Sequence, residues 1–306
     1  MPGNTRAGMQ RDGTPSPPPD WLAEAMKGDF LAARRARWGF RHETWIVERR
    51  DGRTAVVQLR ADGSDPTDPR QRAVRDLVRS GGLPVPEPVR TVRSARGLVV
   101  WLPRVEGKVS AELLATTEGA ALVGRLCGEI ATSLGRLDPG QLALPRAWAS
   151  GDGLRAAMRA NLDGLSDPLP TAVRGELLLA VDRAASEVDL VAPRVVHGDL
   201  APVNVLVRDD RLAAVLDFDR VHLAHPDYDA AWFAWVVSFH HPDVADRACE
   251  AFGLALGRQA RPRANLVWMW PLQLLERVAE AQSPLERTRW QDRLASLRRL
   301  SQYDPG

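Results

Sequence analysis

A change in hydrophobic pattern near residue 105 constrains the fold of this 306-residue chain more than any other feature. Before that point, segments rich in β-branched residues recur at short intervals, over 44–48, 54–59, 89–93 and 98–102. From about residue 112 onward, apolar residues recur every three or four positions, which predicts helices. We therefore expect an α+β protein in which a small antiparallel β-rich region precedes a larger, mainly helical one.

Turn and cap residues subdivide the β-rich region. The pair Asp51-Gly52 is typical of a hairpin turn, and Asp68-Pro69 predicts the N-cap and first residue of a helix that runs to Ser80. A short amphipathic helix is expected over 21–33. The first 20 residues contain five prolines and no apolar periodicity, so we expect a disordered arm there.

The helical part is interrupted once, by strand-like segments between residues 194 and 216, and polar residues follow the ends of these segments. His197-Gly198-Asp199 follows the first, Asn204 begins the second, and Asp217-Phe218-Asp219 follows the third. Because a tight turn joins the last two segments, Asp217 is expected to lie opposite Asn204. Carboxylate and amide oxygens suit Mg²⁺, which also keeps substrate phosphates and water as ligands. Phosphoryl transfer needs such a metal site next to an aspartate that takes the acceptor's proton.

The spacing of these residues resembles the catalytic loop and metal motif of protein-kinase-like enzymes. The sequences His197-Gly198-Asp199 and Asp217-Phe218-Asp219 resemble in particular the aminoglycoside phosphotransferase and choline kinase group of phosphotransferase enzymes. Further along, 225–229 matches another motif of that group at Tyr228 and Asp229, with His225 in place of an aspartate. The resemblance covers about 21–300.

This resemblance implies a protein-kinase-like bilobal fold. Residues 21–105 would form a small, antiparallel β-rich, nucleotide-binding N-lobe with one helix. Residues 106–306 would form a larger, mainly helical C-lobe that carries a catalytic β-hairpin and the substrate site.

The resemblance also implies roles for single residues in the C-lobe. Asp199 is the expected catalytic base, and Asn204 and Asp217 are the expected ligands of Mg²⁺. The expected supporting residues are His197, Asp219 and Asp229.

In the N-lobe the resemblance implies a site for ATP or GTP as the phosphoryl donor. Gly39 belongs to a turn over the phosphates, and Arg60 is the strand-borne cation. Leu102, Arg104 and Val105 are expected at the nucleotide base. The helix after Pro69 lacks the glutamate that usually orients such a cation. Asp68 is near enough to replace it, but its position favours an N-cap.

Charge limits the partners of the protein. Only Lys27 and Lys108 are lysines among the 41 basic residues, and the net charge of +2 is too small to indicate nucleic-acid or anionic-membrane partners. Residues 21–110 hold 18 basic and 11 acidic side chains, which fits either a solvated arginine-rich surface or a bound triphosphate. Residues 221–306 hold ten of each, which disfavours a polycationic acceptor and indicates a neutral or anionic hydroxylated one.

Two residue types allow alternative interpretations. Five of the ten tryptophans fall after residue 229 and either line an acceptor pocket or, as we favour, pack the core. The histidines at 222, 225, 240 and 241 could bind zinc, but their spacing fits no closed tetrahedral site.

The two cysteines, Cys127 and Cys249, lie far apart, and no apolar run is long enough to span a bilayer. We therefore expect a cytoplasmic monomer or homodimer without membrane or nucleic-acid partners. The predicted activity is transfer of a γ-phosphoryl group to a hydroxyl of an antibiotic or hydroxylated metabolite. Two alternatives stay open: a pseudokinase-like nucleotide-binding module, or a kinase of a primary metabolite such as choline, homoserine or a sugar.

Overall fold

The computed structural model describes residues 17–38, 42–165, 169–257, 263–281 and 283–300 of the chain. The chain divides into two compact units. Unit 1 comprises Met1–Arg72 and Pro86–Glu106, and unit 2 comprises Ala73–Val85 and Gly107–Gly306. Of the expected disordered arm, residues 1–16 lie outside the described residues, and helix α1 begins at Asp20.

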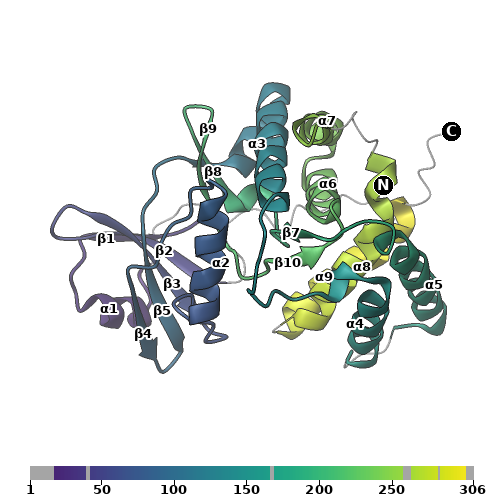
Figure 1. Ribbon diagram of the computed structural model, residues 1–306. Helices are drawn as coiled ribbons and strands as arrows, with labels where there is room; N and C mark the ends of the chain where they lie inside the picture. Colours follow the sequence, from purple (N-terminus) through teal and green to yellow (C-terminus); the bar gives the residue numbers. More distant parts are fainter. Residues whose placement is uncertain (1–16, 39–41, 166–168, 258–262, 282, 301–306) are drawn as a thin grey trace, which may run out of the picture. The chain divides into compact units, whose positions relative to one another are not determined.

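Unit 1 is built on a five-stranded antiparallel sheet with the strand order β1-β2-β3-β5-β4 (Figure 1). Its elements are α1 (Asp20–Met26), β1 (Ala32–Arg35), β2 (Glu43–Glu48), β3 (Thr54–Arg60), β4 (Arg90–Ser94) and β5 (Gly97–Pro103). Helix α2 (Pro69–Ser80) begins in this unit and ends in unit 2.

The core of unit 1 lies on one face of this sheet. Alternate residues of the three central strands are buried together, because successive side chains of a strand point to opposite faces. The strand residues in this core are Trp45, Val47, Val57, Leu59, Val99 and Trp101. Helix α1 packs Trp21 and Leu22 into the same cluster. The sheet predicted from the β-branched segments is thus held by a small core of its own.

The first helix of unit 1 is shorter than the sequence predicts. Helix α1 ends at Met26 because Lys27 and Gly28 adopt left-handed backbone angles, with φ of 50° and 71°. The chain then continues as edge strand β1, which pairs with β2. The predicted helix over 21–33 is therefore wrong in its second half.

The cap assigned to Asp68 is confirmed. Its carboxylate Oδ1 accepts a hydrogen bond of 2.8 Å from the backbone N–H of Arg70, in the first turn of α2. The later part of α2 and the residues that follow it belong to unit 2, where Val74, Val78 and Leu83 join the main core. The division into units therefore differs from the expected one at residues 73–85.

Unit 2 is mainly helical. Its helices are α3 (Thr117–Gly135), α4 (Gly151–Asp163), α5 (Thr171–Val188), α6 (Tyr228–His240), α7 (Ala245–Ala255), α8 (Trp270–Glu280) and α9 (Pro284–Leu300). Short 3₁₀ helices lie at Ser110–Ala115, Ala147–Ala149, Pro202–Asn204, Pro242–Val244 and Arg263–Met269.

Two small sheets interrupt these helices and carry the polar motifs. The first pairs β6 (Lys108–Val109) with β8 (Val205–Arg208), which forms a hairpin with β9 (Arg211–Val215). The second pairs β7 (Arg194–Val196) with β10 (His222–Ala224). The sequence predicts the β8–β9 hairpin but neither β6 nor β10, which are only two and three residues long.

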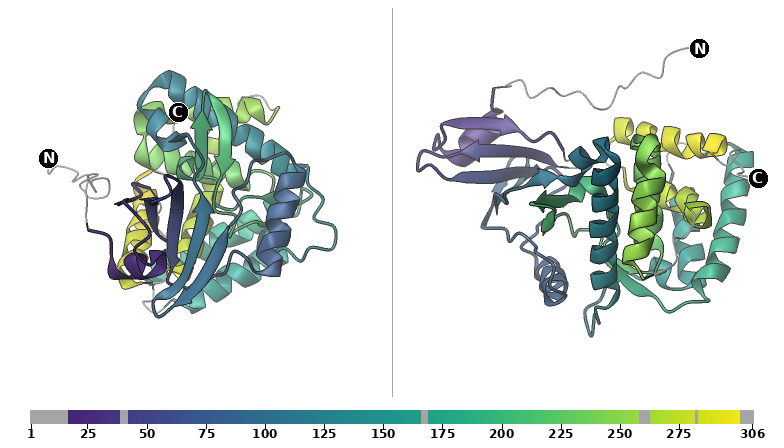
Figure 2. Two further views of the ribbon diagram at one scale, coloured as in Figure 1. Left: turned by 90° about the vertical axis from the view of Figure 1, so that its left-hand side faces the viewer. Right: turned by 90° about the horizontal axis from the view of Figure 1, so that it is seen from above.

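Helix α3 runs beside α6 and α7 in the centre of unit 2 (Figure 2). Small residues permit a close approach of α3 to α7. A Cβ atom added at Gly124 would lie 2.0 Å from the carbonyl oxygen of Ala248, and one at Gly128 would lie 2.6 Å from that of Phe252. The two glycines thus set the distance between these helices. Among the described residues, no helix is long and apolar enough to cross a membrane.

We predict that Gly124→Ala destabilises the protein by about 3 kcal/mol, because the new methyl group meets backbone that cannot move aside cheaply. Gly175→Ala is the matched control: Gly175 lies in helix α5 with nothing within 4 Å of the added Cβ. The control should raise stability by up to about 1 kcal/mol, since alanine is the better helix former. Urea unfolding of both variants measures the difference, and equal effects would contradict the assigned role of Gly124.

Candidate active site

Strand β7 leads directly into the loop that carries His197, Gly198 and Asp199. Gly198 has a φ of 80°, and an added Cβ would lie 2.2 Å from the carbonyl oxygen of Arg220. A side chain at this position would therefore be both strained and in collision with the backbone after β9. The sequence needs glycine here so that the loop can turn Asp199 outward from the strand.

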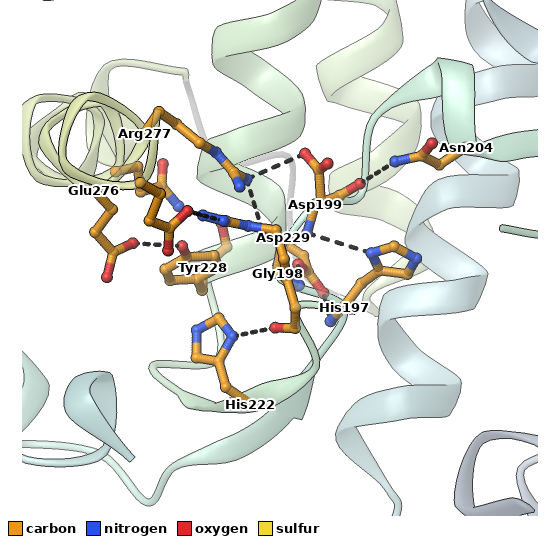
Figure 3. A network of polar contacts seen from close by, with 12 residues as sticks. His197, Gly198, Asp199, Asn204, His222, Tyr228, Asp229, Glu276 and Arg277 are labelled. Atoms are coloured by element: carbon orange, nitrogen blue, oxygen red, sulfur yellow. Dashed lines mark hydrogen bonds and ion pairs between the residues drawn. The ribbon is translucent and has the colours of Figure 1, made fainter. Parts of the chain in front are cut away.

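Asp229, in the first turn of α6, holds this loop by its backbone. One carboxylate oxygen accepts the N–H of His197 at 2.8 Å, and the other accepts the N–H of Gly198 at 3.0 Å (Figure 3). Asp229 is only 2% exposed. Burial raises its pKa above the ordinary value, although the hydrogen bonds from the two N–H groups act in the opposite direction.

The ring of His197 connects the loop to the end of β9. Its Nδ1 accepts the N–H of Asp199 at 3.3 Å, which leaves Nε2 to donate to the carbonyl of Leu216 at 3.0 Å. These two partners define the neutral tautomer with the proton on Nε2. His197 is completely buried, so the ring acts as a fixed spacer between Asp199 and the strand that precedes Asp217.

Asn204 and Asp217 lie at the two chain ends of the β8–β9 hairpin, one before β8 and one after β9. The N–H of Leu216 donates to the carbonyl of Asn204 at 2.8 Å, so Leu216, rather than the expected Asp217, pairs with Asn204, and Asp217 follows it in the chain. Asn204 donates its amide Nδ2 to the carbonyl of Asp199 at 2.9 Å, which leaves the amide oxygen Oδ1 for another partner. Asp217 has a left-handed backbone with φ of 61°, a conformation that marks a constrained position.

These donors fit Mg²⁺. Within the described part of the chain, no three or more His, Cys, Asp or Glu side chains gather as a metal cage. An amide oxygen and a carboxylate are the sparse oxygen set that Mg²⁺ takes together with phosphate oxygens and water. His222, one of the residues considered for zinc, uses its Nδ1–H to donate to the carbonyl of Arg220 at 2.7 Å.

Helix α8 supplies a residue of the site that the sequence analysis missed. Arg277 donates from Nη2 to the carbonyl of Gly198 at 2.8 Å and to Oδ1 of Asp199 at 3.1 Å (Figure 3). Its guanidinium carbon lies 4.3 Å from the ring centre of Trp232. A charged residue between the buried Leu274 and Val278 is the sequence signal that could have revealed it.

The neighbouring Glu276 joins a second set of buried polar groups. It accepts the indole N–H of Trp148 at 2.7 Å and the hydroxyl of Tyr228 at 3.0 Å. Burial raises the pKa of Glu276 to about 7, while the bond from Trp148 and the charge of Arg220 reduce the rise. Arg220 in turn forms an ion pair with Glu280. These groups surround Tyr228, the residue before Asp229.

The candidate residues of the expected nucleotide site belong to unit 1. Arg60 ends β3, is 7% exposed, and donates to the hydroxyl of Ser64 at 3.4 Å. Asp65, in the same loop, is an acidic neighbour. Burial raises its pKa, but hydrogen bonds from Thr67 and the charges of Arg93 and Arg60 outweigh burial and lower it.

The residues expected at the nucleotide base lie at the end of β5. Leu102 is half-buried in the strand, and Arg104 and Val105, which follow it, are exposed and half-buried respectively. Gly39 lies outside the described residues. In unit 2, Asp219 is half-buried in the loop after β9, two residues from Asp217.

The tryptophans of α6 pack the core of unit 2, as favoured. Trp232 and Trp235 are 3% and 1% exposed, and their rings stack with centroids 5.1 Å apart. Trp290 of α9 lies within 6.2 Å of Trp232. We call these three residues the aromatic wall, and Arg277 stacks on its Trp232.

The model of the Phosphotransferase enzyme family matches residues 32–267, and the chain belongs to this family. It is therefore a phosphotransferase, as the resemblance implied. No curated protein sequence matches it significantly.

Solved structures share its kinase-like α+β fold, which confirms the predicted fold class. A thermostable mutant of aminoglycoside phosphotransferase APH(4)-Ia, apo form, has a TM-score of 0.65 at 16% identity, over 93% of this chain and 99% of that one. The GDP complex of aminoglycoside 2'-phosphotransferase-IIIa has a TM-score of 0.62 at 14% identity, over 92% and 98%. Macrolide 2'-phosphotransferase MphH from Brachybacterium faecium has a TM-score of 0.57 at 19% identity, over 90% and 98%.

We predict that Glu276 makes the stability of the protein depend on pH. Because its folded-state pKa of about 7 exceeds the ordinary value of 4.5, its stabilising contribution is complete below pH 4.5 and is lost as the pH rises through 7. Glu276→Gln mimics the protonated acid, so it should gain stability over the wild type between pH 5 and pH 8, by about 3 kcal/mol at most.

Urea unfolding at both pH values measures this gain. The matched control is Glu129→Gln, whose carboxylate is half-exposed and paired with Arg125. The control should show no such gain. If the stability of Glu276→Gln depended on pH in the same way as that of the wild type, the assigned protonation would be wrong.

Proposed function

We propose that this protein transfers the γ-phosphoryl group of ATP or GTP to a hydroxyl of a small acceptor, an antibiotic or a hydroxylated metabolite. Asp199 is the base that takes the hydroxyl proton, and Asn204 and Asp217 hold Mg²⁺. His197, Asp219 and Asp229 support the loop. The observation that carries this proposal is the hydrogen bond from Nδ2 of Asn204 to the carbonyl of Asp199, which joins the loop of the proposed base to the hairpin that ends before Asp217.

The surroundings of Asp199 suit proton transfer. Oδ1 is engaged by Arg277, no described residue forms a hydrogen bond to Oδ2, and a quarter of the side chain is exposed. The backbone on both sides of the carboxylate is fixed, because the N–H of Asp199 is bound to His197 and its carbonyl to Asn204. A base held in this way can accept a proton from a hydroxyl without first reorganising.

The donor oxygens of Asn204 and Asp217 would hold Mg²⁺ against the phosphates of the nucleotide. When bound, the ion neutralises charge on the β- and γ-phosphates and orients them for in-line transfer. The protein contributes the placement: a hairpin hydrogen bond pairs Asn204 with Leu216, the residue before Asp217, and the Asn204–Asp199 bond ties the hairpin to the loop of the base.

The donor site proposed in unit 1 consists of Gly39, Arg60, Leu102, Arg104 and Val105. Arg60 can bind phosphate oxygens with its fork of N–H groups. The carboxylate of Asp65, whose pKa is lowered in part by Arg60, supplies a negative charge near Arg60, whereas Asp76, the acid of helix α2, pairs with Arg79. Complexes of fold neighbours with ADP and hygromycin B and with GDP and kanamycin support a nucleotide donor and a small hydroxylated acceptor.

The charges near Asp199 favour a neutral or anionic acceptor. The guanidinium of Arg277 lies directly beside the base. The acidic side chains of α8 already have partners, since Glu280 pairs with Arg220 and Glu276 binds Tyr228 and Trp148. A polycation at this place would meet like charge without a compensating acidic surface.

We predict that Asp199→Asn lowers kcat by about 1,000-fold, since the amide cannot take the proton. Nucleotide binding, followed by calorimetry with Mg²⁺ and a non-hydrolysable triphosphate, should stay unchanged. Asp209→Asn is the matched control, because Asp209 lies exposed in the turn between β8 and β9. Retention of the wild-type rate by Asp199→Asn would eliminate this residue as the base.

We predict further that transfer of radiolabelled phosphate goes to neutral or anionic hydroxylated compounds rather than to polycations. The panel contains kanamycin and hygromycin B as polycations, a macrolide, choline, homoserine, neutral sugars and hydroxy acids, each offered with ATP and with GTP. Efficient phosphorylation of kanamycin would contradict the charge argument. Nucleotide binding without transfer to any of these acceptors would favour the pseudokinase-like alternative.

A further inference from the structure

The conformation of the Asp199 side chain depends on a contact from a distant part of the chain. Its backbone groups are held by neighbours in sequence, but the carboxylate itself is bound by Arg277, 78 residues further along. In the described structure this guanidinium is 8% exposed and the carboxylate 25% exposed. The guanidinium of Arg277 is thus largely shielded from water, whereas the side chain of Asp199 is partly accessible.

The contacts of Arg277 restrict its side chain to one position. One nitrogen, Nη2, donates both to the carbonyl of Gly198 and to Oδ1 of Asp199. Below the guanidinium plane lies the ring of Trp232, which is packed in turn against Trp235. Stacking on a buried aromatic ring and two fixed acceptors together restrict the side chain to this position.

We propose that Arg277 is the positioning residue of the proton-transfer step. By binding Oδ1 it fixes the rotamer of Asp199 and directs Oδ2 toward the acceptor hydroxyl. This inference rests on the proposed function, in which Asp199 is the base. It assigns to helix α8 a part of the reaction that the loop motif alone does not supply.

A purely structural role of Arg277 would predict a different result. If the bond to the Gly198 carbonyl were all that mattered, loss of Arg277 would loosen the loop and lower stability without a specific effect on kcat. The N–H groups of His197 and Gly198 are, however, already held by Asp229. The loop therefore keeps anchors of its own when Arg277 is removed, whereas the carboxylate of Asp199 does not.

The test compares Arg277→Ala with Arg293→Ala, a matched loss of an arginine from the same aromatic wall. Arg293 lies 4.3 Å from the ring centre of Trp290 and has no bond to Asp199. The assays follow Mg²⁺-dependent phosphate release from ATP and GTP with water as acceptor, and transfer to the best acceptor of the panel. Arg277→Ala should lower kcat by about 100-fold, as expected for a misplaced base, with the KM for nucleotide unchanged.

Guanidinium chloride, added below its denaturing range, should restore part of the kcat of Arg277→Ala, because the free ion can occupy the space left on Trp232. It should not change Arg293→Ala or Asp199→Asn, and sodium chloride at equal ionic strength should restore nothing. Arg277→Lys should be intermediate, since one ammonium group reaches Asp199 or Gly198 but does not reproduce the fork.

Crystal structures of Arg277→Gln and Arg293→Gln give a readout that does not depend on activity. The Asp199 carboxylate should leave its rotamer in the first variant and keep it in the second. An unmoved carboxylate in Arg277→Gln, or a wild-type kcat in Arg277→Ala, would overturn the inference. A wild-type rate in Asp199→Asn would overturn the proposed function instead, so the two failures are distinct.

Discussion

The candidate site depends on one buried carboxylate. Asp229 accepts the N–H groups of His197 and Gly198 with its two oxygens, and thereby closes a loop whose glycine has no conformational alternative. Buried backbone N–H groups must find partners, and here one side chain satisfies two of them. Asp229 fixes the backbone path of the loop. The contacts of the His197 ring and of the Asn204 amide depend on that path. The beginning of helix α6 is for this reason as much a part of the site as the loop itself.

Much of the site could be predicted from the sequence because its residues are close together along the chain. Asp199, Asn204 and Asp217 fall within one strand–loop–hairpin segment, and the local hairpin already pairs Asn204 with Leu216, the residue before Asp217. Strands β2 to β5 of unit 1 were equally predictable, since β-branched runs and an Asp-Gly turn are local signals, but β1 was not. The helix expected over 21–33 failed because Lys27 takes a left-handed conformation that only glycine or asparagine would normally announce.

Contacts between distant segments escaped prediction. The short strands β6 and β10 exist only because β8 and β7 offer them hydrogen-bonding edges, so neither carries a pattern of its own. Arg277 and Glu276 lie nearly 80 residues from the loop, on a helix whose apolar face gives no sign of which neighbours it will meet. The acidic neighbour of Arg60 was sought on helix α2, whereas Asp65 occupies the loop before it. In each case tertiary packing supplies information that spacing along the chain does not contain.

The origin of Arg277 on α8 has a consequence for how such enzymes are recognised. A chain that stopped before Trp270 would retain every motif residue from His197 to Asp229 and would still match the pattern of a phosphotransferase. Asp199, the base that we propose, would nevertheless lack the guanidinium that binds its carboxylate, and the aromatic wall would lose Trp290. A chain of this fold can therefore contain all the motif residues and still lack a complete site. The site is complete only when the C-terminal helices are present.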